Sequence, residues 1–252
     1  MGRTEIPFLP NSFGITFACL FLIVVSRYFI FSGTAYLVCN KIMRERWSRR
    51  RIEAPFPKAR IIRREILWSI GTSAIFALTG ALLIEFWKNG YTKIYNDPAQ
   101  YGWFYFFGSI FLMAFLHDTY FYFTHRLMHR PVLFKIMHRV HHDSRLPTAF
   151  AAFSFHPWES VVEAIILPAL VLVIPIHYAA FLIFLMIMTV LGVVNHLGYE
   201  LFPSNFRKGK ITRWLISATH HQMHHKLVRV NYGLYFTFWD RLLKTHEKTY
   251  DL

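Results

Sequence analysis

Eight of the fourteen histidines in this 252-residue chain are grouped at helical spacings, and a ninth, His196, follows a long apolar run. Residues three or four apart share one face of a helix, so each group directs two or three imidazoles the same way. A tetrahedral site needs four ligands, whereas nine imidazoles suit two octahedral ions that keep positions open for oxygen. We therefore predict two bound metal ions, with the following ligands: His125, His129, His138, His141, His142, His196, His221, His224 and His225.

Three further polar residues are placed to support these ligands. A metal-bound histidine usually donates its second ring N–H to a carboxylate or carbonyl. Asp118 precedes the first ligand by two helical turns, and we predict that it accepts such a hydrogen bond. Glu200 follows His196 by one turn and is either another acceptor, which we prefer, or a further ligand. His220 is predicted to lie beside the ligands or in solvent.

The ligand type alone leaves the metal and the chemistry open. Imidazole binds iron, zinc and copper. A redox metal would oxidise an unactivated C–H bond, and we prefer this chemistry, performed on a lipid. Two alternatives are a membrane protein that binds metal without turnover and a membrane zinc hydrolase. A hydrolase of this kind usually carries H-E-x-x-H, which this sequence lacks.

The elements that must position the histidines are long apolar segments. Hydrophobic residues make up 54% of the chain, and about 20 of them in a row cross a bilayer. Three stretches are that long: Phe13 to Val38, Ile66 to Trp87 and Gly102 to about Phe121. A fourth, Val161 to Asn195, is predicted to be a helical hairpin because it is interrupted by Pro168, Pro175 and His177. We expect an all-α fold, one domain over residues 1–252, with four to five membrane helices and a cytoplasmic helical cap that carries the histidines.

The net charge of +14 is distributed as in a membrane protein and does not indicate nucleic-acid binding. The segment Lys41 to Arg64 carries ten basic residues against two acidic ones, and nine more basic residues follow Asn195. Basic segments favour the cytoplasmic side of a membrane. Charge and the number of spans together predict a multi-pass protein of a bacterial inner membrane or the endoplasmic reticulum. Its N-terminus would lie outside, and every histidine group would lie at the cytoplasmic face.

The segment from Phe104 to Thr245 resembles the fatty acid hydroxylase/sterol desaturase superfamily of membrane enzymes. The resemblance rests on Asp118, Tyr122, His125 and Arg126 in D-x-x-x-Y-x-x-H-R, on the three histidine motifs, on Phe155 to Pro157, and on NYG followed by FWDRL near the C-terminus. It implies two iron ions, O2 as co-substrate, a four-span bundle and a catalytic region over residues 104–245. Sterols, sphingoid bases and fatty acyl lipids are all substrates of such enzymes, by hydroxylation or desaturation.

An oxidation of this kind consumes electrons, and the sequence has no motif for a nicotinamide, flavin or haem group. We therefore expect an external electron donor, such as a cytochrome b5-like protein or a ferredoxin with its reductase. Four basic residues near the last histidine group are candidates for docking an acidic carrier or for binding lipid headgroups: Arg207, Lys208, Lys210 and Arg213.

Overall fold

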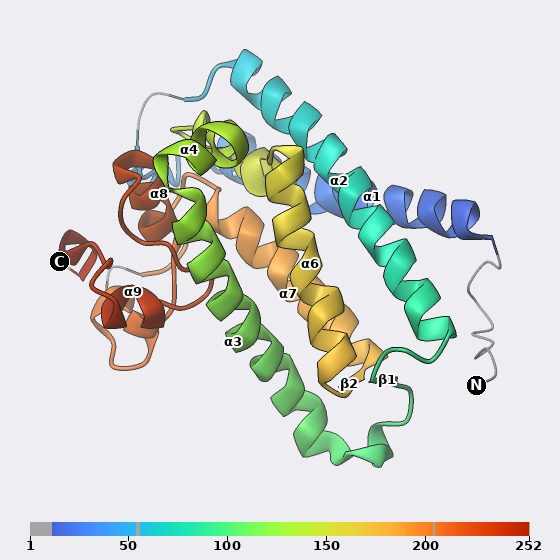
Figure 1. Ribbon diagram of the computed structural model, residues 1–252. Coiled ribbons are helices and arrows are strands. Elements are labelled where there is room, and N and C mark those ends of the chain that lie inside the picture. The colour runs from blue at the N-terminus through green and yellow to red at the C-terminus, as the bar shows by residue number, and fades with distance from the viewer. Residues whose placement is uncertain (1–11, 54–55, 204, 252) are drawn as a thin grey trace.

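The computed structural model describes residues 12–53, 56–203 and 205–251. Its long helices are α1 (Phe13–Leu37), α2 (Ala59–Lys88), α3 (Gly102–Met128), α6 (Pro157–Val173) and α7 (Tyr178–Asn195). Figure 1 shows α2, α3, α6 and α7 running roughly along one direction, with α1 crossing them at one side. The all-α membrane fold expected from the sequence is confirmed.

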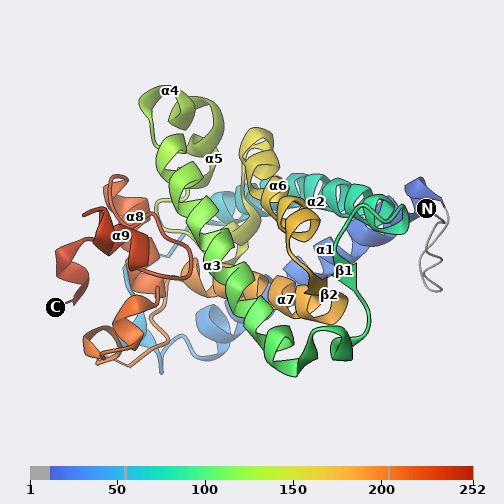
Figure 2. The same cartoon turned by 60° about the horizontal axis from the view of Figure 1, so that its bottom comes forward.

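Short elements occupy the two ends of this bundle. At one end, β1 (Ile94–Tyr95) and β2 (Ile176–His177) form a parallel pair. At the other end lie α4 (Pro131–Leu133), α5 (Arg139–His142), α8 (Ala218–Leu227) and α9 (Phe238–Leu242). Figure 2 shows α4, α5, α8 and α9 gathered away from β1 and β2. All the histidine motifs therefore lie at one end of the molecule.

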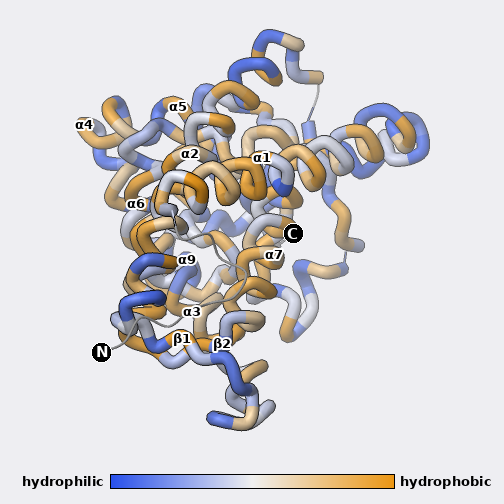
Figure 3. The backbone as a smooth tube through the Cα atoms, turned by 90° about the vertical axis from the view of Figure 1, so that its right-hand side faces the viewer, coloured by the Kyte–Doolittle hydropathy of each residue, from blue (hydrophilic) through white to orange (hydrophobic). Residues whose placement is uncertain are grey.

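Three helices in the described part of the chain are long and apolar enough to cross a membrane: Phe13–Ile42, Ala59–Lys88 and Tyr178–Asn195. They correspond to the first two predicted spans and to the second half of the predicted hairpin. Hydrophobic residues predominate along these helices, and hydrophilic residues collect in the loops (Figure 3). Apolar side chains left exposed along α1, such as Leu22 and Ile30, are those that a bilayer would cover.

The third predicted span forms α3 but is not one of these three helices. Its C-terminal half contains the polar residues His117 and Asp118, which are buried inside the protein: His117 contacts Phe184 of α7, and Asp118 contacts the loop at Leu234. The hairpin is present as α6 and α7, joined by a connection that contains Pro175 and β2, while Pro168 lies within α6 without ending it. Crossing of the membrane by α3 and α6 remains a prediction.

Two buried clusters hold the bundle together. One joins α1 and α7 to the 3-10 helix η5 (Ala149–Phe153), centred on Tyr28, whose hydroxyl donates to the Phe150 carbonyl at 2.9 Å. The other joins α3, α6 and α7 through Met113, Ile166 and Phe184. Both clusters adjoin segments that carry histidines, so packing of the apolar helices fixes where those segments meet.

Candidate metal centre

The three histidine motifs and His196 meet at the ends of α3 and α7. His125 lies in the last turn of α3, and His129 follows its end. Pro131 begins α4, as its lack of an N–H predicts. A wide π-helical turn (Phe134–His138) then leads into the second motif, where Nε2 of His142 lies 3.0 Å from that of His224 in α8. Wide turns of this type are frequent at functional sites.

The nine predicted ligands form two groups, and within each group the ligand atoms lie within 4.8 Å of one another. Two members of the motif that begins at His138 enter the first group and one enters the second. The motif of α8 contributes one histidine to the first group and two to the second. The first group is His125, His129, His138, His142 and His224; the second is His141, His196, His221 and His225.

In both groups the Nε2 atoms face one another. Within the first group, Nε2 of His125 lies 3.0 Å from that of His138. Within the second, Nε2 of His196 lies 2.9 Å from that of His221. Two nitrogens that bind one ion at about 2.1 Å and at right angles are about 3.0 Å apart. The observed spacings therefore match neighbouring positions of an octahedral ion.

The opposite ring nitrogens show that these contacts are not ordinary hydrogen bonds. Nδ1 of His125 donates to the Tyr232 carbonyl at 2.8 Å, and Nδ1 of His138 contacts the Glu159 carboxylate at 2.6 Å. A neutral imidazole that donates through Nδ1 has only a lone pair on Nε2. His125 and His138 thus direct two lone pairs at each other across 3.0 Å. A cation between them relieves this repulsion, so the donor set fits a bound metal.

Burial keeps the imidazoles neutral, as metal binding requires. It lowers the pKa of His125 and of His196 to about 4. For His138 and His221 the pKa falls well below the usual value, because burial and then the neighbouring imidazoles disfavour a positive charge. Near neutral pH the site therefore offers lone pairs rather than protons.

Asp118 has a different role from the one predicted. Its Oδ1 accepts hydrogen bonds from the backbone N–H groups of Leu234 and Tyr235, at 2.9 and 2.7 Å, and no imidazole is among these partners. Its carboxylate therefore fixes the loop that follows Gly233. The Tyr232 carbonyl lies only two residues before Leu234, so Asp118 supports His125 indirectly.

Glu200 also contacts groups other than an imidazole. Its Oε2 accepts from the Ser217 hydroxyl at 2.6 Å and from the Thr219 hydroxyl and N–H at 2.6 and 3.2 Å. These donors stand at the N-terminus of α8, where a carboxylate is favourable. Our preferred expectation that Glu200 accepts an imidazole N–H does not match this geometry. It is also outside both groups of ligand atoms.

His220 lies beside the ligand helix but outside both groups, and it is fully buried rather than solvated. Its ring stacks on His246 at 5.7 Å and meets Tyr250 edge-on at 5.0 Å. Asn231 donates to its carbonyl oxygen at 3.1 Å. These contacts hold α8 against the C-terminal segment.

The carboxylate that does contact a predicted ligand, Glu159, was missed in the sequence. It lies in the first turn of α6 with its side chain 2% exposed, and no short-range spacing connects it to His138. Its position at the start of the apolar helix α6 could have drawn attention to it. A carboxylate in such a position is costly and is usually functional. Glu159 is the clearest addition that the structure makes to the site.

The turn that follows α8 supplies the remaining acceptors. Nδ1 of His224 donates to the Val230 carbonyl at 2.7 Å. Asn231 adopts φ 59°, a left-handed conformation that asparagine tolerates. A Cβ on Gly233 would collide with the Phe236 carbonyl oxygen. Asp240 accepts from the N–H of Tyr232 at 2.8 Å and so closes the turn.

Comparisons with known proteins identify the kind of chain that carries this arrangement. Residues 110–245 match the model of the fatty acid hydroxylase family. The chain is 30% identical to lathosterol oxidase of Rattus norvegicus over 183 residues, which cover 72% of this chain and 60% of that protein. It is 30% identical to Delta(7)-sterol 5(6)-desaturase of Leptosphaeria maculans over 237 residues, 90% of this chain and 60% of that protein. The chain thus spans about 60% of the length of these relatives. No solved structure matches.

Proposed function

The chain belongs to the fatty acid hydroxylase family, and on this premise we propose that it is an O2-dependent di-iron enzyme that oxidises an unactivated C–H bond of a lipid. The observation that carries the proposal is the pair of histidine groups whose Nε2 atoms converge at ligand spacing. The relatives are named for oxidation of sterols, so a sterol ring is the first substrate class to test. Hydroxylation and desaturation both fit this site.

Two iron ions bound at these groups would supply the activation of O2 and the removal of hydrogen from the substrate. The protein holds five of the nine predicted ligands by their Nδ1 side, among them His138 through Glu159 and His125 through the Tyr232 carbonyl. Such supports fix the ring orientation and make Nε2 a stronger donor to metal.

Aromatic side chains separate the ligands from their surroundings. Phe121 lies 4.8 Å from the His125 ring, and Phe155 lies 5.0 Å from the His141 ring. An apolar wall of this kind excludes water, which strengthens electrostatic interactions inside the site and limits side reactions. It also suits the approach of an apolar substrate from the bundle.

The site is proposed to face the cytoplasm. Contacts between the basic loop and the segment after His196 support this orientation: the N–H of Glu200 donates to the Arg50 carbonyl at 2.8 Å, and Arg50 donates to the Leu201 carbonyl at 2.7 Å. The most basic segment and the histidine groups therefore lie at the same end of the bundle. Reporter fusions after Arg51 and after the last residue should both report a cytoplasmic location, and opposite locations would contradict the topology.

We further propose that an external carrier supplies the electrons. In the basic group named above, Arg207 donates to the Tyr250 carbonyl at 2.7 Å, whereas Lys208, Lys210 and Arg213 are exposed. Replacement of Lys208 and Lys210 by glutamate should slow electron delivery by an acidic carrier, more strongly at low salt, without changing metal content. An unchanged rate would assign these residues to lipid headgroups instead.

The decisive experiment combines metal analysis with lipid oxidation. Protein purified without oxygen from iron-replete cells should carry about two metal ions per chain and should oxidise its lipid only when O2 and an electron donor are supplied. His141→Ala and His224→Ala, one from each group, should each lower metal content and abolish oxidation. His177→Ala, in β2 at the opposite end of the bundle and outside both groups, is the matched control. Product formed without O2 or without a donor would refute the proposal.

A further inference from the structure

Two adjoining pockets lie where α1 ends and the basic loop passes beside the metal centre. The first, of about 330 Å³ including space open to solvent, is lined on one side by Leu197 and Gln222, which directly follow two predicted ligands. The second, of about 490 Å³ by the same measure, lies toward the end of α1. Asn40 and Pro57 line both, so the two pockets adjoin, and we refer to the pair as the hollow.

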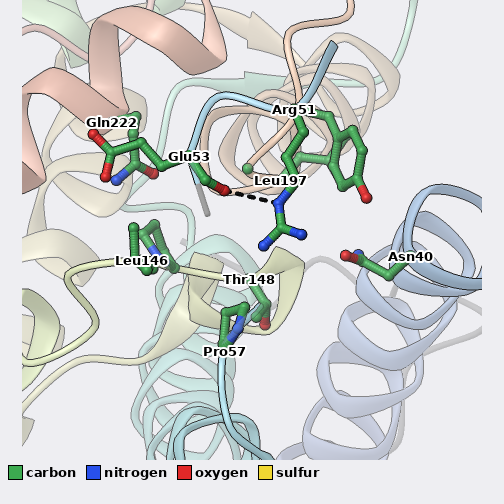
Figure 4. Close-up of a pocket in the computed structure, with 11 residues that line it drawn as sticks. Asn40, Arg51, Glu53, Pro57, Leu146, Thr148, Leu197 and Gln222 are labelled. Carbon is green, nitrogen blue, oxygen red and sulfur yellow. Dashed lines mark hydrogen bonds between the residues drawn. The ribbon is translucent and has the colours of Figure 1, made fainter. Parts of the chain in front are cut away.

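Positive charge is concentrated in this hollow. The Arg51 guanidinium points into the first pocket between Asn40 and Pro57 (Figure 4). The guanidinium carbons of Arg44 and Arg51 lie 4.2 and 3.2 Å from the centre of the Phe56 ring. Lys41 also lines the second pocket. The Phe56 ring thus holds Arg44 and Arg51 close together, and Lys41 at the end of the first membrane helix adds a third positive charge.

Nearby acidic residues do not neutralise this charge. Glu53 lines the first pocket, but its carboxylate is paired with Lys226 at 2.7 Å. Arg51 uses its Nε to donate to the Glu53 backbone carbonyl at 2.7 Å, which leaves the two terminal nitrogens of the guanidinium directed into the hollow. Like charges gathered in this way repel one another, and a bound anion reverses that repulsion.

We propose that this hollow binds the phosphate of an anionic lipid headgroup. The reason for a lipid is position: Lys41 belongs to Phe13–Ile42, one of the helices able to cross a membrane, and Leu37 and Ile42 beside it are exposed apolar residues along which acyl chains can lie. Basic pockets at the cytoplasmic ends of membrane helices bind such headgroups. Arginine suits phosphate because its planar fork donates two parallel hydrogen bonds.

Occupation of this site would strengthen the metal centre. The N–H of Ile52 donates to the Gly198 carbonyl at 3.1 Å, and Arg51 pairs with Tyr199 as an antiparallel bridge. The same short segment continues to Glu200, which holds the N-terminus of α8. A headgroup bound by Arg51 therefore fixes the loop that supports the last histidine motif, and metal retention should rise when the lipid binds.

The test counts bound lipid by native mass spectrometry of the full chain in an uncharged detergent. The probes are dioctanoyl phosphatidylglycerol, dioctanoyl phosphatidylcholine and inorganic phosphate. Phosphatidylglycerol should bind at least tenfold more tightly than phosphatidylcholine. Each basic residue near a membrane surface contributes about fivefold to such binding, so Arg44→Gln with Arg51→Gln should weaken it about 30-fold. Arg60→Gln with Arg63→Gln removes two exposed charges from the same region and is the matched control.

Thermal unfolding without lipid establishes whether the double variant is folded, and Arg44→Gln alone, with about a fivefold loss, replaces it if it is not. Equal binding of the two lipids, or equal losses in the variant and its control, would overturn the site. Displacement of phosphatidylglycerol by inorganic phosphate at similar concentrations would overturn the lipid assignment in favour of a free phosphate. Slower loss of metal to a chelator in the presence of phosphatidylglycerol would support the link to the metal centre.

Discussion

Replacement of Glu159 tests the clearest contact that supports the metal centre. Its Oε1 lies 2.6 Å from Nδ1 of His138, and both side chains are 2% exposed. Glu159→Gln keeps an oxygen acceptor of nearly the same shape but removes the negative charge, which burial disfavours and a cation bound by His138 would favour. Glu159→Leu removes the acceptor and leaves a buried N–H without a partner.

The expected magnitudes follow from the chemistry of this hydrogen bond. A hydrogen bond to a charged group contributes about 1.5–3 kcal/mol, against about 0.5–1.5 kcal/mol for a neutral one. Glu159→Gln should therefore weaken metal binding by about 1–1.5 kcal/mol, or about tenfold. Glu159→Leu should cost the whole interaction, about 100-fold in affinity. This range agrees with the 10- to 100-fold effects usual for groups that support metal ligands.

Competition with a chelator measures the effect directly. The purified variants are titrated, and the metal retained per chain is compared at each concentration, with far-ultraviolet circular dichroism to establish that the helices are intact. Glu163→Gln, one turn further along α6, is the matched control: it removes a neighbouring carboxyl group that raises the pKa of Glu159, so it should retain metal at least as well as the unmodified protein. Equal retention in all three variants would refute the reasoning, because Glu159 would then not act through His138.

Three further predictions concern the loop, the helix and the protonation of the ligands. Asp118→Asn should lower the free energy of unfolding by about 1–3 kcal/mol, because Asp118 accepts from three consecutive backbone N–H groups of the loop; an unchanged denaturation midpoint would contradict it. Glu200→Gln should lower the thermal midpoint by weakening the start of α8, with metal lost earlier on heating, whereas metal lost without any change in midpoint would indicate direct ligation. Burial lowers the pKa of His125 and His196 from 6.5 to about 4, so the unfolded chain binds more protons between these values. The contribution of these two histidines to the free energy of unfolding should be complete above about pH 6.5 and should decline as the pH falls toward 4. Unfolding measured at a series of pH values tests this, and a free energy of unfolding that rises on acidification would refute the neutral state of the two imidazoles.

The grouping of the histidines could be predicted from the sequence because its information is local, whereas their role as metal ligands remains a prediction. Histidines three and four apart must share a helix face, whatever the rest of the fold does. His196 required one further step, since it is alone in its segment and only the return of α7 to the same end of the bundle brings it to the others. The apolar helices could likewise be predicted, because their hydrophobic runs are long enough to cross a bilayer.

The supporting contacts could not be predicted because they join segments far apart in the chain. Asp118 is two helical turns from His125, which made an imidazole contact plausible, yet its partners are backbone groups more than 110 residues away. Glu200 lies one turn beyond His196 in sequence, but the chain leaves the helix at Asn195, so helical spacing no longer applies. Glu159 had no local relation to His138 at all.

The division of each motif between two groups follows from helix geometry. Residues four apart differ by about 40° around the axis and residues three apart by about 60° in the opposite sense. His138 and His142, four apart, share the first group, while His141 between them joins the second. In α8, His221 and His225 share the second group and His224 joins the first. Each H-x-x-H-H motif therefore contributes to both groups, and two copies from distant segments hold the groups side by side. The pair four apart alone would serve a single group, and the histidine between its members is the one that reaches the other group in both copies.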